Sequence, residues 1–178
     1  MGDVLKLGRQ EIFMKEVMGQ IVKTMTSPIS LQTLARKTQL MSYHTVQDYL
    51  SILEHAFSLR TIYAYNPETD SFHFRKEKKF YFTDPIIFWA SIDLLDMKTP
   101  DNHEEQLAEM IAAEWILRKY KRVGYYSSRE GEVDFISKRD WALEIKWAPF
   151  ATNLSKAYKK LILQNKKVWI QGNFFSDL

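Results

Sequence analysis

In the stretch 131-GEVDFISKRDWALEIKW-147, two apolar runs flank a short polar break. The first run carries Asp134, and the second carries Glu144 and Lys146. Because strand side chains alternate between faces, Glu144 and Lys146 point to the same face, about 6–7 Å apart along the strand. If the two runs pair as a hairpin, Asp134 can face the same side. Two carboxylates and an ammonium group would then lie together, which is the minimum set for holding Mg²⁺ and activating a water molecule.

The segments around this stretch predict a mixed α/β fold. The pattern indicates a helix over about 103–120, strands over 122–127, 132–137 and 141–147, a helix over 153–164 and a strand over 167–171. An αβββαβ order in so few residues predicts a mixed sheet covered by helices. The polar segment 96–106, which contains Pro100, is the expected boundary between domains. We therefore divide the chain into residues 1–98 and residues 99–178.

The first of these domains has the element order of a winged helix-turn-helix. Apolar residues at helical spacing predict helices over 9–25, 31–37 and 43–57, and Ser30 and Ser42 are suitable N-caps for the second and third. Strands are expected over 59–65, 71–75 and 79–82, with the turn 66-NPETD-70 between the first two. A linking helix over 84–95 completes the domain.

The composition excludes several classes of function. No apolar run approaches the roughly 18–20 residues that span a bilayer, and the N-terminus lacks a signal-peptide pattern. The absence of cysteine excludes disulfides, thiolate catalysis and cysteine-ligated zinc. The net charge of +3 is small, so contact with nucleic acid must come from local basic patches. We expect a soluble, cytoplasmic protein.

Glu114 is a third acid that bears on the site. It lies near the middle of the apolar stripe of the helix expected over 103–120. A glutamate facing a core is costly unless a cation pairs with it or a metal binds it. Two interpretations stay open. Glu114 either forms a structural pair with Lys146 or Arg118, or points to the same site as Asp134 and Glu144.

Asp134, Glu144 and Lys146, within the αβββαβ order, resemble the signature of the PD-(D/E)xK nuclease superfamily. That signature is an acid on one strand and (D/E)-x-K on the next. This chain has Val133 in place of the proline before the aspartate. The resemblance implies a restriction-endonuclease-like fold for residues 99–178.

The same resemblance implies roles for individual residues. Asp134, Glu144, Glu114 and the backbone carbonyl of Ile145 are expected to hold one or two Mg²⁺ or Mn²⁺ ions. Glu114 matches the helix glutamate of the Holliday-junction resolvase-like branch. Lys146 is expected to orient the attacking water or to stabilise charge on the phosphate.

Nearly the whole chain also resembles the C-terminal region of archaeal and bacterial AAA+ ATPases. The matching segments are 48-DYLSILEHAFSLRTI-62, 79-KFYFTDPIIFWA-90, 132-EVDFI-136 and 143-LEIKW-147. The sequence contains no G-x-x-x-x-G-K-[ST] loop, so no nucleotide site of that kind is expected. The resemblance implies a metal-dependent DNA endonuclease, or a nuclease-like DNA-binding region of an ATPase, with the ATPase domain as a partner in cis or in trans. The alternative is a catalytically inactive interaction or regulatory module of an AAA+ ATPase.

Candidate DNA contacts lie in three segments of the chain. They are the start of the expected recognition helix, the basic run 75-RKEKK-79 of the expected wing, and the last helix. The candidate residues are Tyr43, His44, Thr45, Gln47, Arg75, Lys76, Lys78, Lys79, Lys156 and Lys160. The alternatives are a solvated surface for the lysines and a protein-binding role for the winged helix.

Overall fold

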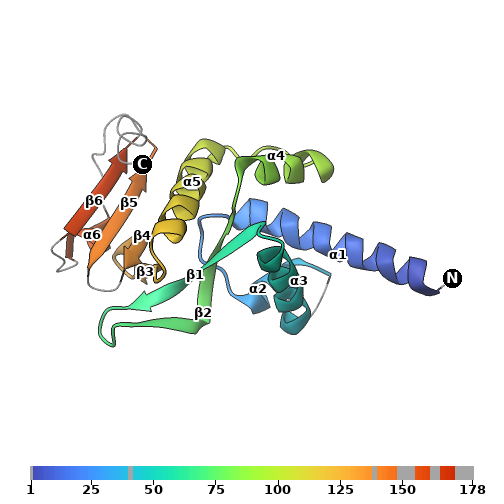
Figure 1. The fold of residues 1–178 in the computed structure, drawn as a ribbon, viewed down its shortest axis with the longest axis horizontal. Coiled ribbons are helices and arrows are strands. Elements are labelled where there is room, and N and C mark those ends of the chain that lie inside the picture. The colour runs from blue at the N-terminus through green and yellow to red at the C-terminus, as the bar shows by residue number, and fades with distance from the viewer. Residues whose placement is uncertain (1, 40–41, 138–139, 148–154, 161–164, 171–178) are drawn as a thin grey trace.

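The computed structural model describes residues 2–39, 42–137, 140–147, 155–160 and 165–170. Over these residues the protein has a mixed α/β fold, with six helices and one six-stranded sheet (Figure 1). The predicted α/β class is therefore confirmed. Helix α1 and strand β6 lie at opposite ends of the molecule. None of the described helices is long and apolar enough to cross a membrane.

The N-terminal elements follow the predicted order. They are α1 (Gly2–Thr24), α2 (Leu31–Lys37), α3 (Tyr43–His55), β1 (Leu59–Asn66), β2 (Ser71–Phe82) and α4 (Pro85–Leu94). The Ser30 hydroxyl caps α2 by accepting a hydrogen bond from Thr33 N. Ser42 precedes α3, but its side chain makes no capping hydrogen bond.

Strand β2 combines two segments that the sequence predicts as separate strands. Its pairing with β1 shifts from Tyr63↔Lys78 to Ala64↔His73. This shift leaves residues 74–77 of β2 without partners on β1, so three residues of the basic run, 75–77, lie in an irregular stretch between two paired segments of the hairpin. The two segments form one strand because the intervening residues also adopt extended backbone.

The C-terminal elements have the predicted helix–strand–strand–strand–helix–strand order. They are α5 (His103–Lys119), β3 (Gly124–Ser128), β4 (Gly131–Ser137), β5 (Trp141–Lys146), α6 (Lys156–Lys160) and β6 (Asn165–Ile170). Phe135 and Leu143 pack in the main core with residues of α5, whereas Ile136 and Ala142 pack with Tyr158 of α6. Helices α5 and α6 therefore cover opposite faces of β4 and β5.

The sheet continues across the expected domain boundary. Its strand order is β2-β1-β3-β4-β5-β6. The β1–β3 and β5–β6 pairs are parallel and the others are antiparallel. Strands β1 and β3 thus join the two halves of the chain through backbone pairing. The division at residue 98 stays a prediction.

A bulge in β4 contains Asp134. The pairing of β3 with β4 runs through Tyr126↔Val133 and then Gly124↔Ile136. Two residues of β4, Asp134 and Phe135, therefore lie opposite one residue of β3. A bulge of this kind bends a strand and redirects its side chains. Here it lies at the first acid of the predicted site.

Candidate functional site

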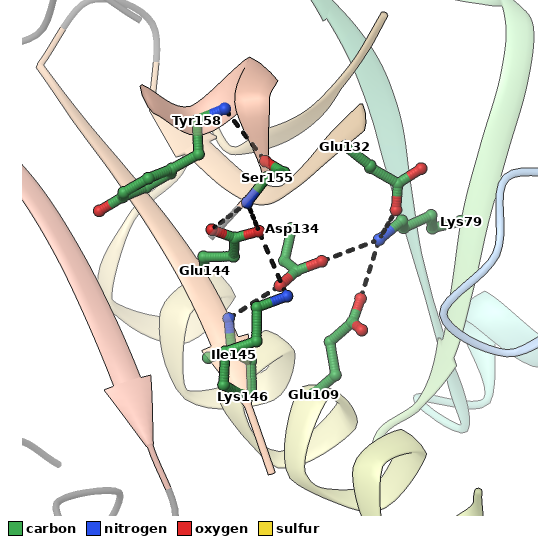
Figure 2. Close-up of polar contacts among 9 residues, drawn as sticks. All are labelled: Lys79, Glu109, Glu132, Asp134, Glu144, Ile145, Lys146, Ser155 and Tyr158. Atoms are coloured by element: carbon green, nitrogen blue, oxygen red, sulfur yellow. Dashed lines mark hydrogen bonds and ion pairs between the residues drawn. The ribbon is translucent and has the colours of Figure 1, made fainter. Parts of the chain in front are cut away.

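Asp134 is hydrogen-bonded to the peptide group between Glu144 and Lys146. Its Oδ2 atom accepts a hydrogen bond of 2.8 Å from Ile145 N (Figure 2). Since β4 and β5 pair directly, as at Phe135↔Leu143, the acid of one strand lies beside the Glu-x-Lys of the next. The structure thus brings the three residues of the predicted signature to one place.

Glu144 and Lys146 are in contact, as their spacing predicts. Lys146 Nζ lies 3.3 Å from Glu144 Oε1. The Glu144 carboxylate is buried and also accepts hydrogen bonds from Ser155 N, at 3.1 and 3.4 Å, just before α6. The Lys146 side chain is 30% exposed, so part of it is in contact with solvent.

A second cation, Lys79 of β2, lies among three carboxylates at the same place. Its Nζ atom is 2.9 Å from Glu109 Oε1, 2.5 Å from Glu132 Oε1 and 3.6 Å from Asp134 Oδ1 (Figure 2). The Lys79 side chain is 0% exposed. The prediction that Lys79 contacts DNA is therefore wrong, because a buried ammonium held by carboxylates cannot reach a phosphate. We call Lys79, Glu109, Glu132 and Asp134 the Lys79 cluster.

Burial and charge shift the pKa values within the Lys79 cluster. Burial raises the pKa of Glu109 to about 7, against the opposing effect of Lys79. Burial raises the pKa of Glu132 as well. Burial alone would lower the pKa of Lys79, but the surrounding acids raise it well above its usual value. Lys79 therefore remains charged and neutralises part of the negative charge of three carboxylates.

Tyr81 completes the cluster from the same strand as Lys79. Its hydroxyl donates a 2.5 Å hydrogen bond to Glu109 Oε1. Burial, and next the charge of Glu109, raise the pKa of Tyr81 well above its usual value. The phenol therefore stays protonated and acts as a hydrogen-bond donor.

Glu114 does not belong to the Lys79 cluster. Its carboxylate accepts hydrogen bonds from Arg60 Nε at 2.9 Å and from Arg118 Nε at 2.6 Å. Of the two interpretations that the sequence left open, the structure shows the ion pair with Arg118, and Arg60 of β1 is an additional partner. The carboxylate of α5 that reaches the cluster is Glu109, five residues earlier.

A pH-dependent contribution to stability is expected from Glu114. Burial acts to raise the pKa of Glu114, but the two arginines outweigh it and lower the pKa below 4.5. A lowered pKa in the folded state contributes stability above the unfolded pKa, and this is lost as the pH falls through the folded pKa. Glu114→Gln should therefore reduce the free energy of unfolding at neutral pH by about 1–3 kcal/mol.

Urea unfolding at several pH values checks this prediction. The Glu114→Gln variant should lose less stability than the wild type on acidification below about pH 4.5. Glu105→Gln is the matched control, since Glu105 is an exposed glutamate of the same helix. Equal acid sensitivity of Glu114→Gln and wild type would contradict the assignment.

Sequence reasoning missed Glu109 and misassigned Lys79, although both left a signal. Glu109 lies at helical spacing from Gln106 and Ala113, which are also buried. Lys79 and Tyr81 alternate with two phenylalanines in a strand end that is buried throughout. Polar groups in such positions require buried partners. The sequence did not reveal that Glu109 is the buried partner of Lys79 and Tyr81.

The donor atoms near Asp134 suit Mg²⁺ in kind. Two carboxylates, of Asp134 and Glu144, and the Ile145 carbonyl make an all-oxygen set, which Mg²⁺ prefers. Within the described residues, no three His, Asp or Glu side chains converge as closely as a metal site requires. The two carboxylates instead accept hydrogen bonds from backbone N–H groups and face the ammonium groups of Lys79 and Lys146.

Comparison with known families assigns the N-terminal half of the chain to a family. Residues 2–98, more than half of the chain, match the family model described as a domain of unknown function, DUF8612. The chain belongs to the DUF8612 family. No curated protein and no solved structure matches it.

The DUF8612 segment, residues 2–98, supplies the cation of the Lys79 cluster but none of its three carboxylates. Lys79 and Tyr81 lie within this segment, whereas Glu109, Glu132 and Asp134 follow it in sequence. The cluster therefore forms between the DUF8612 segment and the part of the chain that carries the predicted nuclease signature.

The other DNA-contact candidates of the DUF8612 segment lie at or near the surface. Tyr43, His44, Gln47, Arg75 and Lys76 are exposed. The rings of Tyr43 and His44 stack with centroids 3.9 Å apart. DNA contact by these residues stays a prediction.

The remaining candidates differ in how far they are open to solvent. Thr45 and Lys78 are half-buried, and Lys78 Nζ lies 5.7 Å from the centre of the Tyr63 ring. In α6, Lys156 is exposed, and the side chain of Lys160 lies outside the described residues. Contact of these residues with DNA also stays a prediction.

Proposed function

We propose that the protein is a metal-dependent DNA endonuclease of the PD-(D/E)xK type, with its site at Asp134, Glu144 and Lys146. One observation carries the proposal. Asp134 of β4 accepts a hydrogen bond from the peptide N–H that lies between Glu144 and Lys146 of β5. The element order α5-β3-β4-β5-α6-β6 supports it, because it is the order expected for a restriction-endonuclease-like domain.

The residues present can supply each part of such a site. Asp134, Glu144 and the carbonyl of Ile145 would hold Mg²⁺ or Mn²⁺, which supplies an activated water and neutralises phosphate charge when bound. Asp134 Oδ1 lies 3.6 Å from Lys79, too far for a hydrogen bond, so this oxygen retains acceptor capacity. The partly exposed side chain of Lys146 would bring its ammonium group to a phosphate oxygen or to the attacking water.

The DUF8612 segment would bind the nucleic acid as a winged helix. The α1–α2–α3–β1–β2 order supports this, with α3 as the recognition helix and the β1–β2 hairpin as the wing. Exposed Arg75 and Lys76 lie in the unpaired stretch of β2 between the two segments that pair with β1. Basic side chains in that position suit contact with phosphates.

Cleavage by the purified 178-residue chain tests the proposed function. Supercoiled and linear DNA should be cut in the presence of Mg²⁺ or Mn²⁺ and not in EDTA. Lys146→Ala should reduce the rate by about 100-fold or more, because it removes the positive charge that stabilises the transition state. Asp134→Asn should have a similar effect through the loss of a carboxylate ligand.

A matched control variant shows whether a loss of cleavage activity is specific to the proposed site. Lys98→Ala should cut as fast as the wild type, since Lys98 is 86% exposed and lies in an ion pair with Asp101. Absence of cutting by the wild type with either ion and either form of DNA would contradict the proposal. Equal rates for Lys146→Ala and wild type would remove Lys146 from the mechanism.

A second candidate function has its own supporting observation. Lys79 already lies within ion-pair distance of three carboxylates inside the fold, as in a site with a structural role. This favours a catalytically inactive module, and the resemblance of the chain to the C-terminal region of AAA+ ATPases implies such an ATPase as the partner that it would bind and regulate. In that case the protein would cut no DNA and bind no Mn²⁺, but would change the rate of ATP hydrolysis by an AAA+ ATPase domain supplied in cis or in trans.

A further inference from the structure

We propose that Lys79 is the positioning residue for Asp134, so that the DUF8612 segment holds the first acid of the site in place. The role in catalysis rests on the proposed nuclease function. The positioning itself does not, and it can be measured separately.

The contacts of Asp134 show two anchors on opposite sides of its carboxylate. Oδ2 accepts the hydrogen bond from Ile145 N at 2.8 Å, and Oδ1 faces Lys79 Nζ at 3.6 Å (Figure 2). The first anchor belongs to β5 and the second to β2, four strands away in the sheet order. The carboxylate is therefore held between two parts of the sheet that approach it from different sides.

Asp134 needs such an anchor because of its place in the strand. It lies in the β4 bulge, where regular pairing does not fix the direction of the side chain. A carboxylate within reach of Glu109 and Glu132 is also subject to repulsion from like charges. Without a cation in the middle, the three acids would turn away from one another, and Asp134 would leave the Ile145 N–H.

Lys79 is itself held firmly enough to serve as this cation. Its side chain is 0% exposed, and Glu109 and Glu132 each lie within 2.9 Å of the ammonium nitrogen. Lysine is almost never fully buried unless it is paired. Two acids thus fix the position of Nζ, and Nζ in turn fixes the position of the third acid, Asp134.

The amide resonance of Ile145 reports the position of Asp134 directly. In ¹⁵N–¹H spectra of the full chain, Lys79→Met should shift the Ile145 amide toward its frequency in Asp134→Ala, because both changes remove the same hydrogen bond. The Leu143 amide, on the same strand, serves as the internal reference. A purely structural role for Lys79 would lower stability without a selective shift at Ile145.

A second variant keeps the test valid if Lys79→Met does not fold. Lys79→Met/Glu109→Gln removes both charges of the most buried pair, so fewer buried carboxylates remain without a cation than in Lys79→Met. It still deprives Asp134 of its cation, and the Ile145 amide should again shift. An Ile145 amide at its wild-type frequency in this double variant would overturn the proposal.

Chemical rescue separates the ammonium group from the rest of the side chain. In Lys79→Ala, ethylammonium should return the Ile145 amide to its wild-type frequency, or restore the folded spectrum if the variant is unfolded. Tetramethylammonium carries the same charge but has no N–H to donate, and should have no effect. Equal effects of the two ions, or of neither, would count against a specific ammonium site.

DNA cleavage provides the last arm of the test. If the proposed function is correct, Lys79→Ala should lose activity and ethylammonium should restore it. A wild-type chain that cuts no DNA overturns the proposed function, while the Ile145 shift still decides the positioning role. A variant that cuts at the wild-type rate with Asp134 displaced would overturn the catalytic part of the inference.

Discussion

Replacement of Lys79 by methionine is expected to lower the free energy of unfolding by about 3–5 kcal/mol. Methionine matches the length of the lysine stem but carries no charge. The substitution would leave three carboxylates, of Glu109, Glu132 and Asp134, without the cation that now lies 2.5 to 3.6 Å from them. A buried charge that has lost its partner is far more costly than the pair was favourable.

Denaturant unfolding of matched variants measures this loss. Lys98→Met makes the same chemical change at a side chain that is 86% exposed and should alter stability by less than about 0.5 kcal/mol. Lys79→Met/Glu109→Gln should recover part of the loss, since it also removes a buried charge. If Lys79→Met were as stable as Lys98→Met, Lys79 would not be the central cation of the cluster.

Substitution of Gly124 by alanine is expected to cost about 3 kcal/mol, at the upper end of the range for overpacked sites. A Cβ atom at this position would lie 2.5 Å from the backbone oxygen of Tyr63 and 2.6 Å from the Phe72 ring. Gly124 pairs with Tyr63 where β3 runs beside β1. A backbone oxygen cannot move aside without disturbing this pairing, which joins the two halves of the sheet.

Gly19→Ala provides a matched control with a different expected result. Gly19 lies within α1, where alanine is favoured over glycine by about 0.5–1 kcal/mol. Its added Cβ would meet the Leu95 side chain at 3.2 Å, and a side-chain methyl group yields more readily than backbone. Thermal unfolding should show little change for Gly19→Ala and a clear loss for Gly124→Ala. Similar melting temperatures for the two variants would contradict the steric argument.

Most of the fold could be predicted from the sequence because the signals for it are local. Helical spacing of apolar residues placed α3 and α5 and most of α1, which begins at Gly2 and not at residue 9, and the cap at Ser30 fixed the start of α2. Alternation and turn residues located the strands of both halves. The error at β2 arose because residues 76–78 are all charged, which is typical of a loop, while their backbone is extended.

The site was predicted only in part. The contact of Glu144 with Lys146 follows from strand geometry, and the approach of Asp134 follows from a short hairpin. Glu114 and Glu109 are both buried on α5, and the apolar stripe of the helix pointed to Glu114 alone. The structure separates them, since Arg60 and Arg118 pair with Glu114 and Lys79 pairs with Glu109.

The stretch 131–147 by itself determined two strands, their pairing and the presence of an acid, a second acid and a lysine close together. These are properties of neighbouring residues, and strand geometry is enough to derive them. Only the tertiary structure decided which cation lies beside Asp134, because Lys79 is distant in sequence and reaches the site through the continuous sheet. Long-range ion pairs depend on where the sheet places two chain segments, and no local pattern encodes that placement.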